Sequence, residues 1–94
     1  MPRPERPVNP QGPIATFAIG LRALRAHAGL SYRQMAERTH YCVSVLSTAA
    51  SGEMLPTWNV TKAYVHVCGG HPEYWRAQWL HASAAWKGAG HGPA

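Results

Sequence analysis

Apolar residues recur every three or four positions along most of this chain, and glycine, proline or short polar runs interrupt the pattern. The first such stretch fits one buried face of a helix. Its apolar members are Ile14, Phe17, Leu21, Leu24 and Ala28. Gly29 follows directly, at a position where a left-handed residue commonly ends a helix. The pattern therefore predicts a helix over 14–28.

A second stretch, 31–52, has the signals of two short helices joined by a tight turn. Ser31 and Gln34 stand at the spacing of a capping box, which predicts the start of the first of these helices. Residues 39–41 form a turn too short for the two helices to lie antiparallel side by side. The second helix is predicted over about 42–50, and Gly52 suits a left-handed position after it.

The helix expected over 42–50 has two different faces. Leu46 and Ala49 point toward a core, while the opposite side carries side chains small enough to approach another macromolecule closely. These outer residues are Val43, Ser44, Ser47 and Thr48. Two short helices at a steep angle, the second with such an outer face, are typical of a DNA-binding helix-turn-helix.

The last third of the chain predicts two further helices. Thr57 is placed to cap a helix that begins at Trp58 and ends near Cys68. Its expected core residues are Val60, Ala63, Tyr64 and Val67. Two glycines then break the helix, and Pro72 and Glu73 suit the first turn of a final helix that ends near residue 87.

We therefore expect an all-α fold of five helices with no strand. Residues 1–13 hold five prolines and almost nothing to bury, which predicts a flexible Pro-rich arm. The helical domain is expected over 14–87, and a flexible tail over 88–94. Arg3 and Arg6 make the arm either a basic arm that touches a DNA groove or a solvated leader.

Composition narrows the choice of partners. Charged residues make up 14% of the 94, and nine Lys and Arg oppose four acidic residues, which gives a net charge of +5. A basic excess suits a polyanion, although proteins without such a partner also carry one. No apolar run reaches the length of a membrane span and no signal peptide is visible, so we expect a cytoplasmic protein.

Several motifs, in order and at a common spacing, point to one family. The run GLSYRQMAER (29–38) looks like the GLSQEELAEK opening of the XRE (Cro/repressor-like) helix-turn-helix family, and the match continues through Ser44, Leu46 and Gly52. The flanking runs FAIGLRALRAHAGLSYRQMA and AASGEMLPTWNVTKAYVHVCGG are similar to a branch common in actinomycete bacteria. The resemblance covers about residues 14–80 and implies a compact repressor-like domain that regulates transcription.

In that family the helix over 42–50 enters the major groove of double-stranded DNA, and the start of the preceding helix rests on the phosphate backbone. Carried over position by position, the base-contacting residues are Val43, Ser44, Ser47 and Thr48. The phosphate-contacting residues are Tyr32, Arg33 and Ser51. A homodimer is expected, because a single unit of this kind reads too few bases for useful specificity.

The chain departs from the family pattern at the groove-facing helix. Related sequences usually carry Arg, Lys, Gln or Asn in place of Val43 and Thr48, side chains that hydrogen-bond to bases. Strong guanine recognition is therefore not expected here, and thymine methyl contacts and shape readout remain. Cys42 stands where a capping Ser or Thr is usual, so the helix has a poorer N-cap.

A second departure concerns Arg25. The family usually pairs this arginine with a glutamate near the end of the groove-facing helix, and Ala50 takes that place here. Arg25 must then pair with Glu37 or Glu53, or be free to bind a phosphate.

Three tryptophans, Trp75, Trp79 and Trp86, fall on one stripe of the last helix. Each buries on the order of 200 Å², so such residues usually belong to a core. We expect core positions for Trp75 and Trp79, and either core or interface for Trp86. Where the stripe is exposed, Trp79 and Trp86 form a candidate partner or dimer surface.

The chemistry of the remaining side chains argues against metal, cofactor or catalysis. His66, Cys68 and His71 resemble a metal cluster, but they bridge a helix end and a glycine break and lack a fourth ligand. Cys42 and Cys68 are expected as reduced thiols. The chain has no nucleophile–base–acid order, no Gly-rich phosphate loop and no acidic pair, so we expect neither an enzyme nor a cofactor.

The alternative function is a protein-interaction module that uses the helix-turn-helix fold. Val43 and Val45 would suit an apolar protein surface, and the actinomycete branch is similar to proteins that work beside small acidic partners or in larger signalling chains. Salt dependence separates the two functions, because DNA binding weakens steeply with salt and an apolar protein contact does not.

Overall fold

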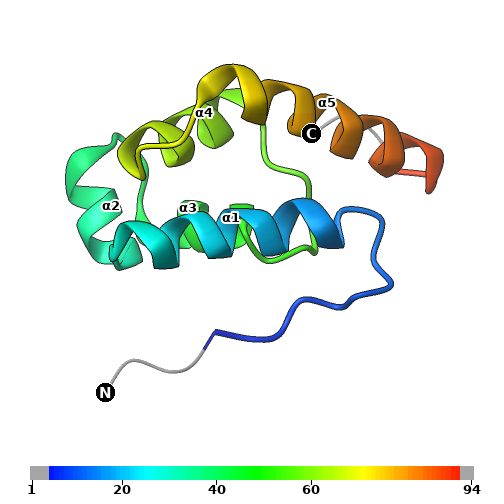
Figure 1. The fold of residues 1–94 in the computed structure, drawn as a ribbon. Coiled ribbons are helices and arrows are strands. Elements are labelled where there is room, and N and C mark those ends of the chain that lie inside the picture. The colour runs from blue at the N-terminus through cyan, green and yellow to red at the C-terminus, as the bar shows by residue number, and fades with distance from the viewer. Residues whose placement is uncertain (1–4, 92–94) are drawn as a thin grey trace.

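The computed structural model describes residues 5–91, and within that range it has five helices and no strand. Their bounds are α1 Ala15–Ala28, α2 Tyr32–Arg38, α3 Val43–Ala49, α4 Trp58–Val67 and α5 Pro72–Gly88. In Figure 1, α1 and α3 form one layer, α4 and α5 form the other, and α2 closes one end. The all-α class expected from the sequence is confirmed, and the helix bounds differ from the predicted ones by a residue or two.

Local signals set the helix ends as predicted. The Thr57 hydroxyl accepts a hydrogen bond from the Val60 amide at 3.3 Å and so caps α4. Gly29 and Gly69, with φ angles of 70° and 76°, follow α1 and α4. The residue after each glycine donates its amide to a carbonyl near the end of the helix, which is the Schellman pattern.

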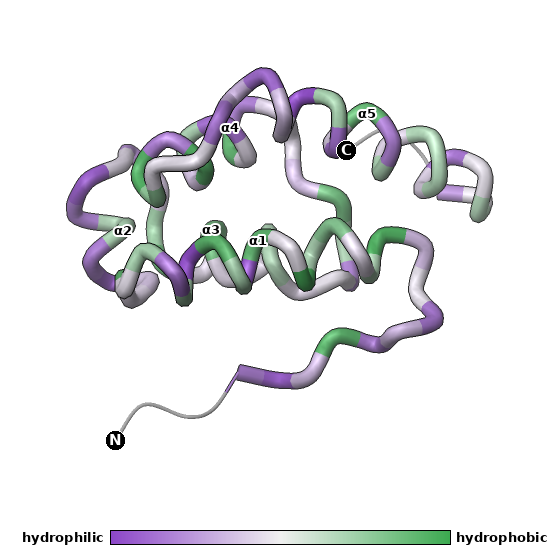
Figure 2. The backbone as a smooth tube through the Cα atoms, in the orientation of Figure 1, coloured by the Kyte–Doolittle hydropathy of each residue, from purple (hydrophilic) through white to green (hydrophobic). Residues whose placement is uncertain are grey.

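The core lies between the two layers. Its fully buried members include Leu21, Met35, Leu46, Tyr64 and Val65. The Tyr64 hydroxyl donates to the Leu21 carbonyl of α1 at 3.0 Å, so its polar atom is satisfied inside the core. Burial raises the pKa of Tyr64, which therefore stays neutral. Figure 2 shows hydrophobic and hydrophilic positions alternating along the helices, as expected where one side of each packs on a shared core.

The buried face of α4 differs from the predicted one. Three residues expected in the core are only half-buried: Val60, Ala63 and Val67. Thr61 and Val65 are fully buried instead, beside the correctly predicted Tyr64. Thr61 is tolerated there because its hydroxyl donates to the Thr57 carbonyl at 2.9 Å. The apolar pattern therefore predicted the buried face one position too early in the sequence. It treated Thr61 as a surface residue, whereas the Thr61 hydroxyl is hydrogen-bonded within its own helix.

The three tryptophans of α5 differ in how deeply they are buried. Trp75 is 8% exposed and lies in the core, as predicted. Trp79 is half-buried and donates its indole N–H to the Pro56 carbonyl at 2.8 Å. Trp86 is only 9% exposed, and its ring stacks on that of His91 at 3.7 Å between centroids. The chain itself covers most of Trp86, which therefore lies in the core of the monomer.

The described part of the N-terminal arm, residues 5–13, runs back beneath α1 (Figure 1). The Glu5 carboxylate lies 3.5 Å from Nε of Arg22, and the Tyr32 hydroxyl donates to it. A second anchor is the Arg6 carbonyl, which accepts a hydrogen bond from the Arg22 guanidinium. The arm is thus held against the domain by polar contacts; Arg3 lies outside the described residues.

Arg25 has a partner that the sequence did not indicate. Its Nη2 lies 3.4 Å from the Glu5 carboxylate, and its Nη1 donates to the Leu30 carbonyl at 2.9 Å. Within residues 5–91, neither Glu37 nor Glu53 pairs with it. The expected pairing was wrong because Glu5 is remote in sequence and reaches Arg25 only when the arm folds back.

Candidate nucleic-acid interface

Helices α2 and α3 form the two-helix motif, and α2 begins at the predicted capping box. The Ser31 hydroxyl accepts from the Gln34 amide at 3.1 Å, and the Gln34 side-chain oxygen accepts from the Ser31 amide at 2.9 Å. These reciprocal bonds fix where α2 starts. As a consequence Arg33 stands in the first turn of α2 with its side chain exposed.

A short turn then leads from α2 into α3. The Thr39 hydroxyl accepts from the Tyr41 amide at 3.2 Å, which holds the turn. The two helices pack on each other, and each sends one fully buried residue, Met35 or Leu46, into the core. No side-chain hydrogen bond caps α3 at Cys42, so the N-cap is poor, as predicted. Packing rather than capping holds α3 in place.

The outer face of α3 carries the four residues predicted to contact bases. Val43 is 43% exposed, and Ser44 and Thr48 are also exposed. Ser47 is half-buried and donates its hydroxyl to the Ser44 carbonyl at 3.3 Å, although its oxygen still has room to accept. This face therefore offers methyl groups and hydroxyls to a partner and carries no charge.

The three residues predicted to contact phosphates are less alike than the sequence implied. Tyr32 is half-buried and donates to Glu5; burial and this hydrogen bond both raise the pKa of Tyr32, which keeps it a neutral donor. The Ser51 hydroxyl donates to the Thr48 carbonyl at 2.7 Å. Arg33 takes part in no ion pair within the described residues. Of the three side chains, Arg33 is the one left to meet a phosphate.

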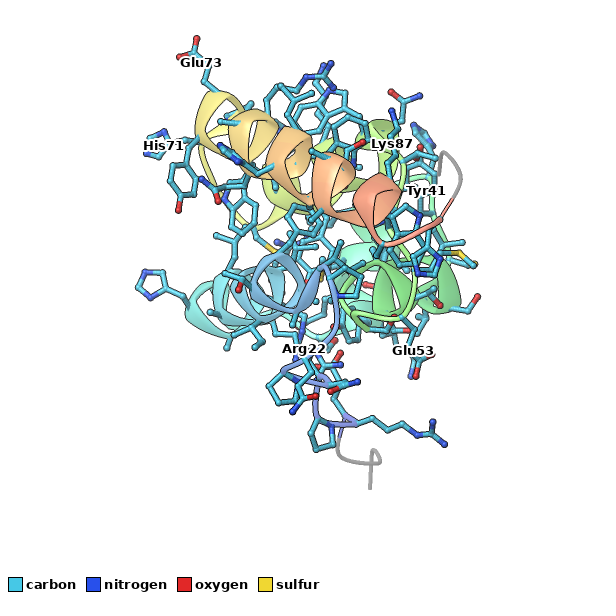
Figure 3. The ribbon with its side chains drawn as sticks, turned by 90° about the vertical axis from the view of Figure 1, so that its right-hand side faces the viewer. Arg22, Tyr41, Glu53, His71, Glu73 and Lys87 are labelled. Carbon is cyan, nitrogen blue, oxygen red and sulfur yellow. The ribbon has the colours of Figure 1, made fainter. Side chains whose placement is uncertain are left out.

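The sequence missed the arm as a neighbour of α3. A polar hollow of about 210 Å³ lies between the arm and the C-terminal half of α3. Its lining residues include Arg6, Arg22, Ser47, Thr48, Ser51 and Glu53. Figure 3 shows Arg22 reaching from α1 toward the arm, and Glu53 on the same side of the molecule.

A second hollow flanks the other side of α3. It is an apolar groove of about 510 Å³ between α3, the loop that follows it and the end of α5. Val45 and Met54, which are 37% and 58% exposed, line it together with the otherwise covered Trp86. Ser44 and Thr48 also line this groove, so it adjoins the small-residue face of α3.

The described residues contain neither a cluster of metal-ligating side chains nor a long apolar helix. Among residues 5–91, no three His, Cys, Asp or Glu side chains gather closely enough to hold a metal ion, and this includes His66, Cys68 and His71. In the same range no helix is long and apolar enough to cross a membrane.

The two cysteines are expected to differ in reactivity. Hydrogen bonds from the Ser44 side chain and the Val45 amide lower the pKa of the exposed Cys42, whereas burial raises the pKa of Cys68. Since the thiolate is the nucleophile, a disulfide reagent near neutral pH should modify Cys42 at least about tenfold faster than Cys68. Stopped-flow absorbance measures both rates. Cys42→Ser should remove the fast phase alone, and a single slow phase in the unaltered protein would contradict the assignment.

Comparison with known proteins adds one finding. A family model described as a helix-turn-helix domain matches residues 16–85, which include all five helices except the first and last few positions. No curated protein and no solved structure matches the chain. The match covers both the two-helix motif and the helices that pack against it.

Proposed function

The chain belongs to the helix-turn-helix domain family, and from this membership we propose that it is a DNA-binding transcription regulator. In the proposed complex α3 enters the major groove and the start of α2 rests on the phosphate backbone. The protein acts by binding rather than by catalysis. Its proposed target is double-stranded DNA, and its proposed location is the cytoplasm.

The observation that carries the proposal is the outer face of α3. Val43, Ser44 and Thr48 are exposed on a helix whose inner face is locked by the fully buried Leu46. Small side chains allow the helix backbone to come close to base edges, and Arg33 adds a positive charge at the neighbouring helix start. The net charge of +5 favours encounter with a polyanion.

The chemistry of this face sets the kind of sequence it recognises. Methyl groups of Val43 and Thr48 can contact thymine methyls, and the hydroxyls can make single hydrogen bonds to bases. No side chain there forms the bidentate bonds that select guanine, so each unit discriminates modestly. We propose that a homodimer doubles the contacts, as in the XRE family whose actinomycete branch the sequence resembles. Selection of bound DNA from a random pool tests this directly, and a two-fold symmetric site is the expected result.

Two substitutions should separate positioning from base readout. Arg33→Ala should weaken binding to every DNA sequence alike and lower the salt slope by about one, because a phosphate contact carries no sequence information. Thr48→Ala should cost on the order of 1 kcal/mol on the selected site and leave non-specific binding nearly unchanged. Fluorescence anisotropy on selected and scrambled DNA, at two salt concentrations, measures both effects. Groove reading by α3 fails as a proposal if neither variant changes binding to any DNA.

A second function has its own support in the apolar groove beside α3. Val45, Met54 and Trp86 line a groove of about 510 Å³ whose apolar character suits one face of an amphipathic helix from a protein partner, such as a small acidic protein. Binding there would hardly respond to salt. Val45→Ser, which adds no charge, should then weaken partner binding, whereas DNA binding through the small-residue face should survive this change.

A further inference from the structure

The N-terminal arm is placed to take part in DNA binding, and this inference rests on the proposed function. Glu5 contacts three side chains from two helices, at 3.5 Å to Arg22, 3.4 Å to Arg25 and through the Tyr32 hydroxyl. These contacts join the arm to α1 and to the start of α2. The start of the described arm therefore lies beside both α1 and the first residue of α2.

Further contacts fix the arm beyond Glu5. The Arg6 carbonyl accepts from the Arg22 guanidinium, whose Nε also donates to the Ala50 carbonyl at 2.7 Å, just after α3. Val8 packs so closely on Gly52 that a Cβ there would lie 2.7 Å from the valine methyl. The backbone on both sides of Arg6 is thus held against α1 and the end of α3.

The side chain of Arg6 remains exposed on this fixed backbone. It shares the 210 Å³ hollow with Ser47, Thr48 and Ser51 of the α3 region. Glu53 lines the same hollow, yet no ion pair engages Arg6 anywhere in residues 5–91. A cation whose backbone is already ordered loses less entropy when it contacts a ligand.

Around the hollow, Arg6, Arg22 and Arg25 face the carboxylates of Glu5 and Glu53, which leaves one positive charge in excess. Both Arg22 and Arg25 lie against the single carboxylate of Glu5, so that negative charge is more than balanced. Arg6 is left as the cation that faces solvent beside the C-terminal half of α3. A phosphate that flanks the bases under α3 would meet it there.

We propose that Arg6 is a phosphate-contacting residue beside α3, and that Glu5 is the positioning residue that holds it there through Arg22, Arg25 and Tyr32. The arm and the two-helix motif then bind DNA as one surface. Base readout stays with α3, while Arg6 adds affinity that does not depend on sequence.

The test compares the salt dependence of DNA binding in matched variants. Arg6→Ala should lower the slope of log affinity against log salt concentration by about 0.9. The loss of DNA affinity relative to the unaltered protein should then be about 3.5-fold smaller at about 200 mM salt than at about 50 mM. The same change in a Glu5→Gln background should alter the slope clearly less, because an arm released from its anchor no longer presents Arg6. Lys62→Ala removes one positive charge from an exposed position on α4 and should leave the slope unchanged.

Each outcome decides the proposal. If Arg33→Ala lowers the slope and Arg6→Ala does not, DNA binding stands and the role of Arg6 is wrong. If Arg6→Ala lowers the salt slope equally in both backgrounds, Glu5 does not position Arg6. If Lys62→Ala lowers the slope as much as Arg6→Ala does, net charge alone explains the result. Failure of the unaltered protein to bind any selected DNA would instead overturn the proposed function. Thermal melts of every variant verify that the fold is retained.

Discussion

Ser44→Glu is expected to abolish binding to every DNA sequence, by a factor on the order of a hundred or more. Ser44 is exposed in the first turn of α3, at the centre of the face proposed to enter the groove. A carboxylate there would face phosphates and base acceptors, and like charges brought together in an interface cost several kcal/mol. The fold should survive, because an acidic residue is favourable in the first turn of a helix.

The control for this substitution is Ala77→Glu on α5. It introduces the same charge at an exposed position in the other layer of the molecule, so DNA binding should fall only by the small amount due to net charge. Electrophoretic mobility shift and anisotropy titrations on one selected site compare the two. Equal losses in both variants would mean that charge alone drives binding and that α3 has no special place in the interface.

The second large effect concerns stability. Trp86→Ala should lower the free energy of unfolding by about 3 kcal/mol, because Trp86 is 9% exposed and its removal leaves a cavity at the end of α5. A domain of this size has a total stability of about 5–15 kcal/mol, so the variant should melt well below the unaltered protein. Urea denaturation followed by far-ultraviolet circular dichroism measures the change.

Leu80→Ala on the same helix is the matched control. Leu80 is 51% exposed, so its truncation should change the free energy of unfolding by about 0.5 kcal/mol or less. Sedimentation of both variants separates folding from assembly. A Trp86→Ala protein that keeps its stability but no longer forms dimers would show that the tryptophan belongs to an interface rather than to the core.

The two hollows beside α3 meet at Thr48, which lines both of them. The polar hollow joins α3 to the arm, whereas the apolar groove joins α3 to the end of α5 through Val45 and Met54. The proposed DNA-binding face and the groove share Ser44 and Thr48, so DNA and a partner in the groove would compete for part of α3. Val45 and Met54 line only the apolar groove, and Arg6 lines only the polar hollow, so variants at these residues test one function without removing the other.

The sequence by itself determined the helices and their ends. The capping box of Ser31 and Gln34, the Thr57 cap and the positive-φ glycines all act over a few residues, so their spacing in the chain predicts their structure. The two-helix motif followed in the same way, because its turn length and its two-faced second helix are local features. The family match confirms that part of the interpretation.

Only the tertiary structure decided which residues these helices bury and which distant groups meet. The buried face of α4 turned by one position because Thr61 satisfies its hydroxyl on its own helix. Trp86 became a core residue because the ring of His91 and the neighbouring helices cover it. Glu5 reached Arg25 because the arm folds back, a contact across 20 residues that no local spacing encodes. Such contacts depend on the packing of whole elements, and this is why the arm's place beside α3 could not be seen in the sequence.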